Sequence, residues 1–81
     1  MQDVKYYITV HDEHGNKLYD INYFEKFNEA KKYFETVDRN FIEQYKNYFS
    51  IKENLCSVGL YEEIMDKTER LTVILLFYKT F

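Results

Sequence analysis

Residues 71–78, Leu-Thr-Val-Ile-Leu-Leu-Phe-Tyr, constrain the fold most, because this run is apolar at both parities of a strand. Successive side chains of a strand point to opposite faces of its sheet, so such a run needs cover on both sides. The rest of the chain offers one amphipathic helical stripe, which can cover only one face. We therefore expect the second face to meet another polypeptide.

Three further segments show the alternation of apolar and polar residues that is typical of half-buried strands. They are residues 4–10, 17–24 and 55–61. The polar segment between the first two ends in Gly15-Asn16, which predicts a hairpin turn. In the second segment the pattern places Tyr19, Ile21 and Tyr23 on one face of the sheet.

Between the second and third strands the apolar residues follow steps of three and four, which predicts a helix. The stripe consists of Phe27, Ala30, Phe34, Val37, Phe41, Tyr45 and Tyr48. Its phase continues through residues 38–40, so the pattern favours one helix of about 21 residues over two short ones. Asn28 is its expected N-cap, Phe49 or Ser50 its expected end, and Asn54 its expected C-terminal cap.

These elements predict a single α+β domain over residues 1–81 with the order ββαββ. We expect a two-layer sandwich in which one long helix packs on a four-stranded, mostly antiparallel sheet. The fourth strand, residues 70–80, is the most apolar and is expected in the middle of the sheet. The predicted strand order is 2-1-4-3, with the first and fourth strands parallel.

Composition limits the class of protein. Nine Tyr and seven Phe predict an aromatic core, and a single cysteine cannot form a disulfide within the chain. We find neither a signal-peptide pattern nor an apolar stretch near the about 20 residues that span a bilayer, so we expect a cytoplasmic protein without membrane contact. The preference for residues of A+T-rich codons suggests a low-GC bacterium or one of its phages.

No motif in the chain indicates a reaction. Metal-ligating residue types gather only at His11, Asp12, Glu13 and His14, which lie on a predicted turn without a further ligand, so a solvated turn is favoured over a metal site. Cys56 shares its parity with Val58 and is expected to be buried and inert. We expect no enzymatic activity, no cofactor and no small-molecule substrate.

The uncovered sheet face is the candidate interface. If Leu71, Val73, Leu75 and Phe77 meet the helix, the opposite face carries Tyr7, Leu55, Tyr61, Ile74, Leu76 and Tyr78. A contiguous apolar patch on a small protein is typical of an interaction surface. The alternative is that aromatic rings and flanking polar side chains shield this face from water.

Charged residues suggest two further readings. The connection before the fourth strand is predicted to be a loop with Glu62, Glu63, Asp66 and Glu69, which either binds a basic partner or keeps the protein soluble. Lysines lie beside aromatic residues in segments 5–7, 31–34 and 45–49, as in proteins that stack on single-stranded nucleic acid. The net charge of −3 argues against nucleic-acid binding.

The sequence therefore predicts a small, non-catalytic protein–protein interaction module. Its expected partner is a second copy bound through the open sheet face, or a larger host protein. An accessory or inhibitor protein of a phage or mobile element fits the size and the codon preference. The alternative is a nucleic-acid-associated regulator that uses the Lys and Tyr positions.

Overall fold

The computed structural model describes residues 3–81, which form four strands and two helices. Their order along the chain is β1 (Asp3–His11), β2 (Lys17–Phe24), α1 (Phe27–Thr36), α2 (Arg39–Phe49), β3 (Ser57–Met65) and β4 (Leu71–Thr80). The α+β class and the four-stranded sheet are thus confirmed, and the strand bounds agree with the sequence pattern within four residues.

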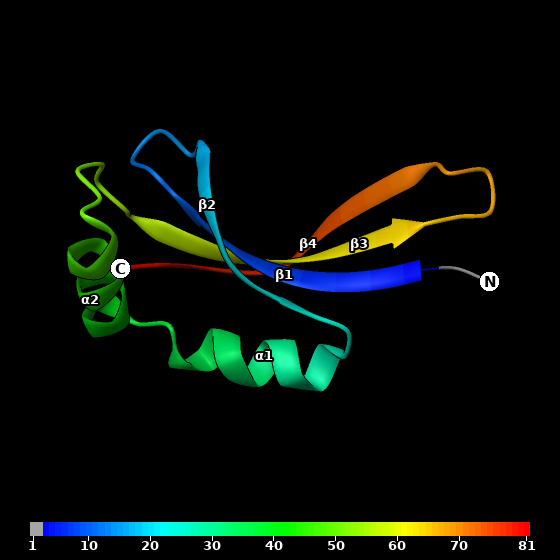
Figure 1. The fold of residues 1–81 in the computed structure, drawn as a ribbon, viewed down its shortest axis with the longest axis horizontal. Coiled ribbons are helices and arrows are strands. Elements are labelled where there is room, and N and C mark those ends of the chain that lie inside the picture. Colours follow the sequence, from blue (N-terminus) through cyan, green and yellow to red (C-terminus); the bar gives the residue numbers. More distant parts are fainter. Residues whose placement is uncertain (1–2) are drawn as a thin grey trace.

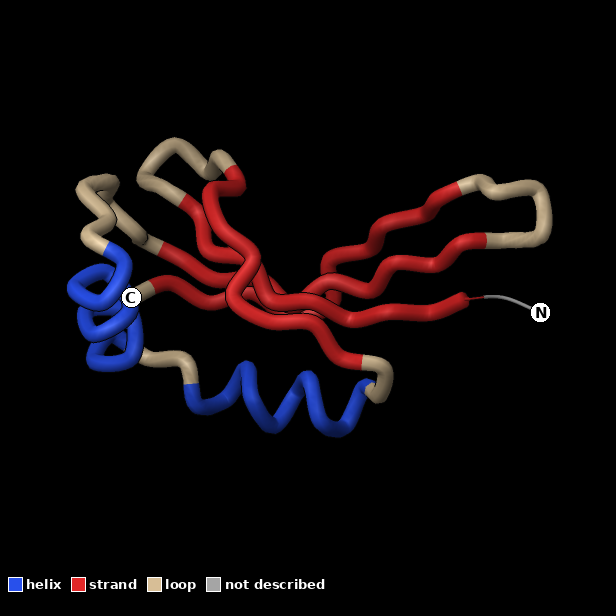
Figure 2. Tube along the Cα trace, in the orientation of Figure 1, coloured by secondary structure: helices blue, strands red, loops and turns tan. Residues whose placement is uncertain are grey.

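All four strands are antiparallel and lie in the order β2-β1-β3-β4. Helix α1 packs under β1, β2 and β3, whereas α2 lies across the end of the sheet where the chain also ends (Figure 1). The two hairpins rise on the side away from α1, so the uncovered face of the sheet lies between them (Figure 2). The β3–β4 hairpin extends well past the start of α1 (Figure 1).

The predicted order 2-1-4-3, with a parallel pair in its middle, is wrong because β3 rather than β4 lies beside β1. Val58 and Leu60 of β3 are completely buried, whereas residues 71–75 of β4 are all exposed. This order makes every pair antiparallel, and antiparallel pairs are slightly more stable per residue than parallel ones. The most apolar strand therefore lies at the edge of the sheet.

The single long helix is also wrong, because the chain breaks between Thr36 and Arg39. Val37 is extended and fully buried, and the Asp38 carboxylate caps α2 by accepting a hydrogen bond of 2.8 Å from the Phe41 amide. Aspartate favours such caps over helix interiors. The apolar stripe keeps its phase across the break, so periodicity alone cannot reveal it.

The helix ends otherwise differ from the pattern only in their caps. The N-cap of α1 is Lys26, not the predicted Asn28. Helix α2 ends at Phe49 as predicted, but its C-cap is Ser50 in the left-handed conformation with φ of 53°, not Asn54.

The core lies between the sheet and α1 and is built mainly from small and branched side chains, with further aromatic rings around it. Ile8, Val10, Val58 and Leu60 of the central strands are fully buried against Ala30, Phe34 and Val37, and Ile42 and Leu55 complete the cluster. The surrounding half-buried residues include Tyr6, Phe24, Tyr33, Phe41 and Phe81. Phe34 is thus the aromatic member of the buried cluster, and the expectation of an aromatic core is otherwise correct only for its periphery.

Bulges interrupt both outer strand pairs. In β2 the register skips Leu18 and Ile21, and in β4 it skips Leu76. A bulge inserts one residue and reverses the parity of the strand beyond it. Tyr19 consequently lies opposite Val10 on the helix side, whereas Tyr23 lies opposite Tyr7 on the other side. The prediction that Tyr19 and Tyr23 share a face is therefore wrong.

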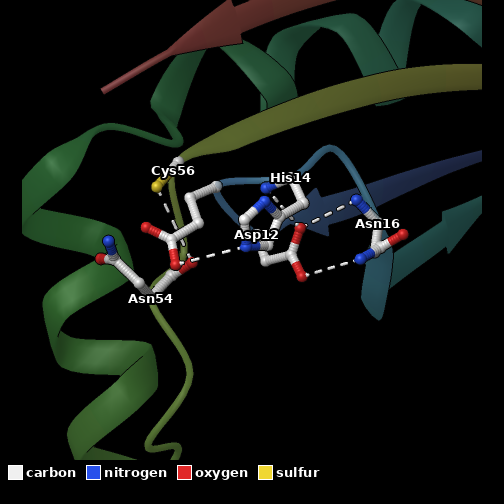
Figure 3. A network of polar contacts seen from close by, with 6 residues as sticks. Asp12, His14, Asn16, Asn54 and Cys56 are labelled. Carbon is white, nitrogen blue, oxygen red and sulfur yellow. Dashed lines mark hydrogen bonds and ion pairs between the residues drawn. The ribbon is translucent and has the colours of Figure 1, made fainter.

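The two hairpin turns share one geometry. Asp12 and Asp66 open them, and each carboxylate accepts hydrogen bonds from backbone amides two and four residues later, at 2.8 to 2.9 Å. Figure 3 shows Asp12 turned toward Asn16 in the first of these turns. The fourth turn residue has positive φ in both cases, 80° at Gly15 and 62° at Glu69. Hydrogen bonds to these carboxylates lower the pKa of both aspartates.

Replacing Glu69 by glycine should stabilise the protein by about 1 kcal/mol, because only glycine adopts the left-handed conformation without steric cost. The first turn already has glycine at this position. Chemical denaturation of Glu69→Gly and of Gly15→Ala should show changes of opposite sign. A loss of stability in Glu69→Gly would mean that the Glu69 side chain makes a stabilising contact.

Candidate protein interface

The sheet face away from α1 is called here the open face, and strand pairing determines which side chains it carries, because directly paired residues share a face. Tyr7 pairs with Tyr23 and Tyr61, Tyr61 pairs with Leu75, and Gly59 pairs with Thr9 and Tyr78. Toward the free end of the β3–β4 hairpin, Glu63 pairs with Val73 and Met65 with Leu71. The open face is thus aromatic at its centre and aliphatic at one end.

The centre of the open face is closed by its own side chains. The Tyr7 and Tyr61 rings stack with their centroids 5.3 Å apart, and the Lys17 ammonium lies 4.2 Å from the Tyr61 ring centroid. The Tyr61 hydroxyl lies 2.8 Å from Nε2 of His11, whose Nδ1 lies 3.3 Å from the Ser57 hydroxyl. His11, Ser57 and Tyr61 are all buried, so the centre of the face is shielded from water, whereas Tyr23 and Tyr78 beside it are exposed.

The other half of the open face remains uncovered, and so does the reverse side of the same hairpin. We call residues 62–75 the hairpin arm. Beyond the helices, its large apolar side chains are exposed on both sides of the sheet: Met65, Leu71, Val73 and Leu75 on the open face, and Ile74 on the helix side. Leu71 and Leu75 are each 48% exposed. The apolar run thus lacks cover on two faces rather than on one.

The structure separates the six predicted interface residues into two groups. Tyr7, Tyr61 and Tyr78 lie on the open face as predicted, although only Tyr78 is largely exposed. The placement of Leu55 is wrong, since this residue precedes β3 and is buried in the core. Ile74 and Leu76 are wrong as well: Ile74 lies on the helix side with Tyr6 and Glu62, and Leu76 is the half-buried bulge residue.

Leu71, Val73 and Leu75 were expected under the helix, yet they lie on the open face. The bulge at Leu76 is the cause, because Phe77 beyond it does meet the helix and contacts the rings of Phe27 and Phe34. The local sequence carries no clear sign of this bulge. Met65 and Tyr23 are two further exposed residues of this face that the sequence pattern did not identify.

The predicted acidic loop is a strand for half of its length. Glu62 and Glu63 are paired residues of β3 and point to opposite faces, while Asp66 and Glu69 belong to the five-residue turn. Asp66 uses its carboxylate to hold that turn together. The four acids therefore do not form one loop surface that could bind a basic partner.

His11 should make the stability of the fold depend on pH. Burial lowers the pKa of this imidazole below its usual 6.5, as does Lys17 on β2, while Asp12 opposes the shift. Three other groups face the ring. Two are the hydroxyls of Ser57 and Tyr61 on β3, and the third is the ring of Tyr78 on β4. A neutral imidazole suits these partners because it offers one donor and one acceptor.

Since the unfolded chain takes up a proton at His11 more readily than the folded chain, stability is complete above pH of about 6.5 and falls as the pH drops below it. We expect a lower free energy of unfolding at pH 5 than at pH 7, measured by urea denaturation. In His11→Asn this dependence should flatten. An unchanged slope between these pH values would show that other groups titrate with folding.

The metal-ligand cluster and Cys56 are the remaining candidate sites from the sequence. Within residues 3–81 no three His, Cys, Asp or Glu side chains are placed to hold a metal ion. Cys56 is half-buried rather than buried as expected, and it lines a groove of about 330 Å³ with Arg39, Lys46 and Phe81. Its thiol lies 3.8 Å from the Asn54 carbonyl (Figure 3). No described helix is long and apolar enough to cross a membrane.

The lysine–aromatic segments do not form one surface. Tyr6 and Phe34 pack toward the core, and the Lys31 ammonium lies over the Phe77 ring. Among these three segments, only residues 45–49 at the end of α2 present bare rings, with Tyr48 83% exposed and Phe49 beside it. A groove of about 540 Å³ lies next to them and is lined by Tyr19, Tyr45, Phe49, Ser50, Ile51, Lys52 and Glu53.

The geometry thus defines a small α+β protein with an exposed apolar edge strand. Comparison with known proteins adds no relative: no family profile, no curated protein and no solved structure matches the chain.

Proposed function

We propose that this chain is a non-catalytic protein–protein interaction module that binds through the hairpin arm. The supporting observation is the exposure of residues 71–75, all of which are open to water although four of them are large and apolar. Monomeric soluble proteins rarely leave a contiguous patch of this kind uncovered. A binding partner that covers the arm would remove this apolar surface from water.

The shielding of the central aromatic half supports the same reading. Tyr7, Tyr61 and His11 contact one another and leave little for a partner to bind, whereas the exposed large aliphatic side chains of the described residues all lie in the arm. The His11, Ser57 and Tyr61 groups resemble a proton-transfer set by type, but they are buried beneath Lys17 and Leu75, where a substrate has no access. This arrangement favours binding over catalysis.

An accessory or inhibitor role in a phage or mobile element remains part of the proposal. It is supported by size and codon preference, and its target would be the protein that covers the arm.

The test compares the wild-type chain with Leu75→Asp, which places a charge in the centre of the arm. We expect wild type to self-associate, or to retain a specific partner when immobilised, and Leu75→Asp to lose this by about 100-fold in affinity. Tyr48→Asp is the matched control, since Tyr48 is exposed far from the arm on α2. A monomeric wild type that retains no partner, or equal behaviour of both variants, contradicts the proposal.

A second candidate function is binding of single-stranded nucleic acid at the end of α2. The specific observation is the exposed pair Tyr48 and Phe49 with Lys46 and Lys52 nearby, because bases stack on bare rings and phosphates attract lysine. Retention on single-stranded DNA at about 50 mM salt, lost at higher salt and in Tyr48→Asp, would favour this function. Absence of retention at low salt removes it.

A further inference from the structure

We propose that β4 of one copy pairs antiparallel with β4 of a second copy, so that the two chains share one sheet of eight strands, four from each. This inference rests on the proposed function, because it names the occupant of the same apolar arm. It differs from stacking of two open faces, since the contact is made by the backbone edge of β4 together with side chains on both of its faces.

The backbone of β4 is available for such pairing. Within residues 3–81 this strand pairs only with β3, and it forms the outermost strand of the sheet. An edge strand presents a row of N–H and C=O groups that another strand can bind. The strand is long, and α1 contacts it at Phe77 and Lys79, beyond the Leu76 bulge.

The two edges of the sheet are built differently. Strand β2 at the opposite edge carries Asp20 and Asn22 and is interrupted by bulges at Leu18 and Ile21. Charges and bulges are devices by which proteins prevent edge pairing. Residues 71–75 of β4 have neither a charge nor a bulge. One edge is therefore protected and the other is suited to pairing, which would stop the assembly at two copies.

The side-chain pattern of β4 is compatible with its own copy in one register. Pairing centred on Val73 places Val73 opposite Val73 and Leu71 opposite Leu75 of the second copy, all on the open face. Thr72 then lies opposite Ile74 on the helix side. This register uses all five residues before the bulge at Leu76 and keeps both sheets facing the same way, as a two-fold axis requires.

Charge is compatible with the same register. Arg70 and Lys79 fall outside the five paired residues, so no like charges are opposed within the pairing.

The apolar surface within the paired segment fits a weak dimer. Four exposed large residues of β4 lie in this segment: Leu71, Val73, Ile74 and Leu75. At roughly 80 to 100 Å² for each half-exposed large side chain, two copies would bury at most about 640 to 800 Å² of side-chain surface, to which the paired strand backbone adds. Interfaces below about 1,200 Å² are typically weak, so we expect dimer formation in the micromolar range.

Sedimentation at about 1 to 100 µM tests the proposal with two lysine variants on opposite faces of β4. Val73→Lys lies on the open face and Ile74→Lys on the helix side, and both residues are exposed, so the fold should be retained by circular dichroism. If β4 pairs with β4, each variant should weaken the dimer by about 100-fold, and Tyr48→Lys should leave it unchanged. A dimer sensitive only to Val73→Lys would mean open-face packing and overturns edge pairing.

Disulfide cross-linking tests the register. In a Cys56→Ser background, Val73→Cys should form a covalent dimer under mild oxidation, because the two-fold axis brings the two copies of residue 73 together. Tyr48→Cys should remain monomeric. Absence of the Val73→Cys dimer overturns this register. A monomeric wild type that still retains another protein, with loss in Leu75→Asp, overturns β4 pairing but leaves the proposed function intact.

Discussion

Replacement of Phe34 by alanine is expected to lower the free energy of unfolding by about 3 to 5 kcal/mol. The Phe34 ring is buried in the core and also contacts β4, where it lies 6.3 Å from the Phe77 ring. The Lys79 ammonium lies 4.6 Å from the Phe34 ring centroid and donates a hydrogen bond of 2.7 Å to the Phe34 carbonyl. Removing the ring leaves a cavity and abolishes the ring contacts with Phe77 and Lys79, whereas alanine keeps the carbonyl that Lys79 binds.

Urea denaturation at fixed protein concentration measures this effect. Small domains are stable by only about 5 to 15 kcal/mol, so the variant should be close to unfolding at room temperature. The matched control is Tyr48→Ala, which removes an aromatic ring that is almost fully exposed and should change stability by less than about 0.5 kcal/mol. A cost below about 1 kcal/mol for Phe34→Ala would contradict the observed packing of α1.

Replacement of Gly59 by alanine is expected to destabilise the fold by about 1 to 3 kcal/mol, although alanine normally suits a strand better than glycine. A Cβ at this position would lie 2.9 Å from Cε2 of Tyr61, 3.0 Å from Cδ1 of Leu75 and 3.1 Å from Cε1 of His11. Tyr61 and His11 are buried and hydrogen-bonded to each other, so they cannot move aside freely.

Leu75 is the flexible member of this group because it is exposed. Truncating the Leu75 side chain should therefore relieve part of the clash. In a double-mutant cycle, Gly59→Ala should cost less stability in a Leu75→Ala background than in wild type. Additive effects would contradict the contact. The Gly59→Ala variant should also move Leu75 outward, which would change the arm surface on which the proposed binding depends.

The sequence pattern predicts the elements of this protein well. The alternation of residues 4–10 and the apolar run near the C terminus correspond to β1 and β4, and the helical stripe correctly identifies the buried residues Ala30, Phe34 and Val37. The pattern misses the break at Asp38 because the stripe keeps its phase on both sides of it. Periodicity reports which residues are buried, but not whether the backbone between them is continuous.

The exposed apolar surface was predicted in kind but not in its residues. An uncovered apolar surface is predicted because residues 71–78 are apolar on both faces and the helical stripe can cover only one. The structure shows exposed apolar residues in this run. The members differ, since Leu55 is in the core, and Val73 and Leu75 replace Ile74 and Leu76 on the open face. A single inserted residue at Leu76 reverses the face of every side chain before it.

The amino-acid sequence by itself determined which segments are extended and which are helical, and that its last strand has more apolar surface than one helix can cover. These properties depend on neighbouring residues, whose spacing sets which side chains share a face. Only the tertiary structure decided that β4 lies at the edge and which of its side chains face outward. Both depend on pairing with β3, where Gly59 makes room for the rings of Tyr61 and His11.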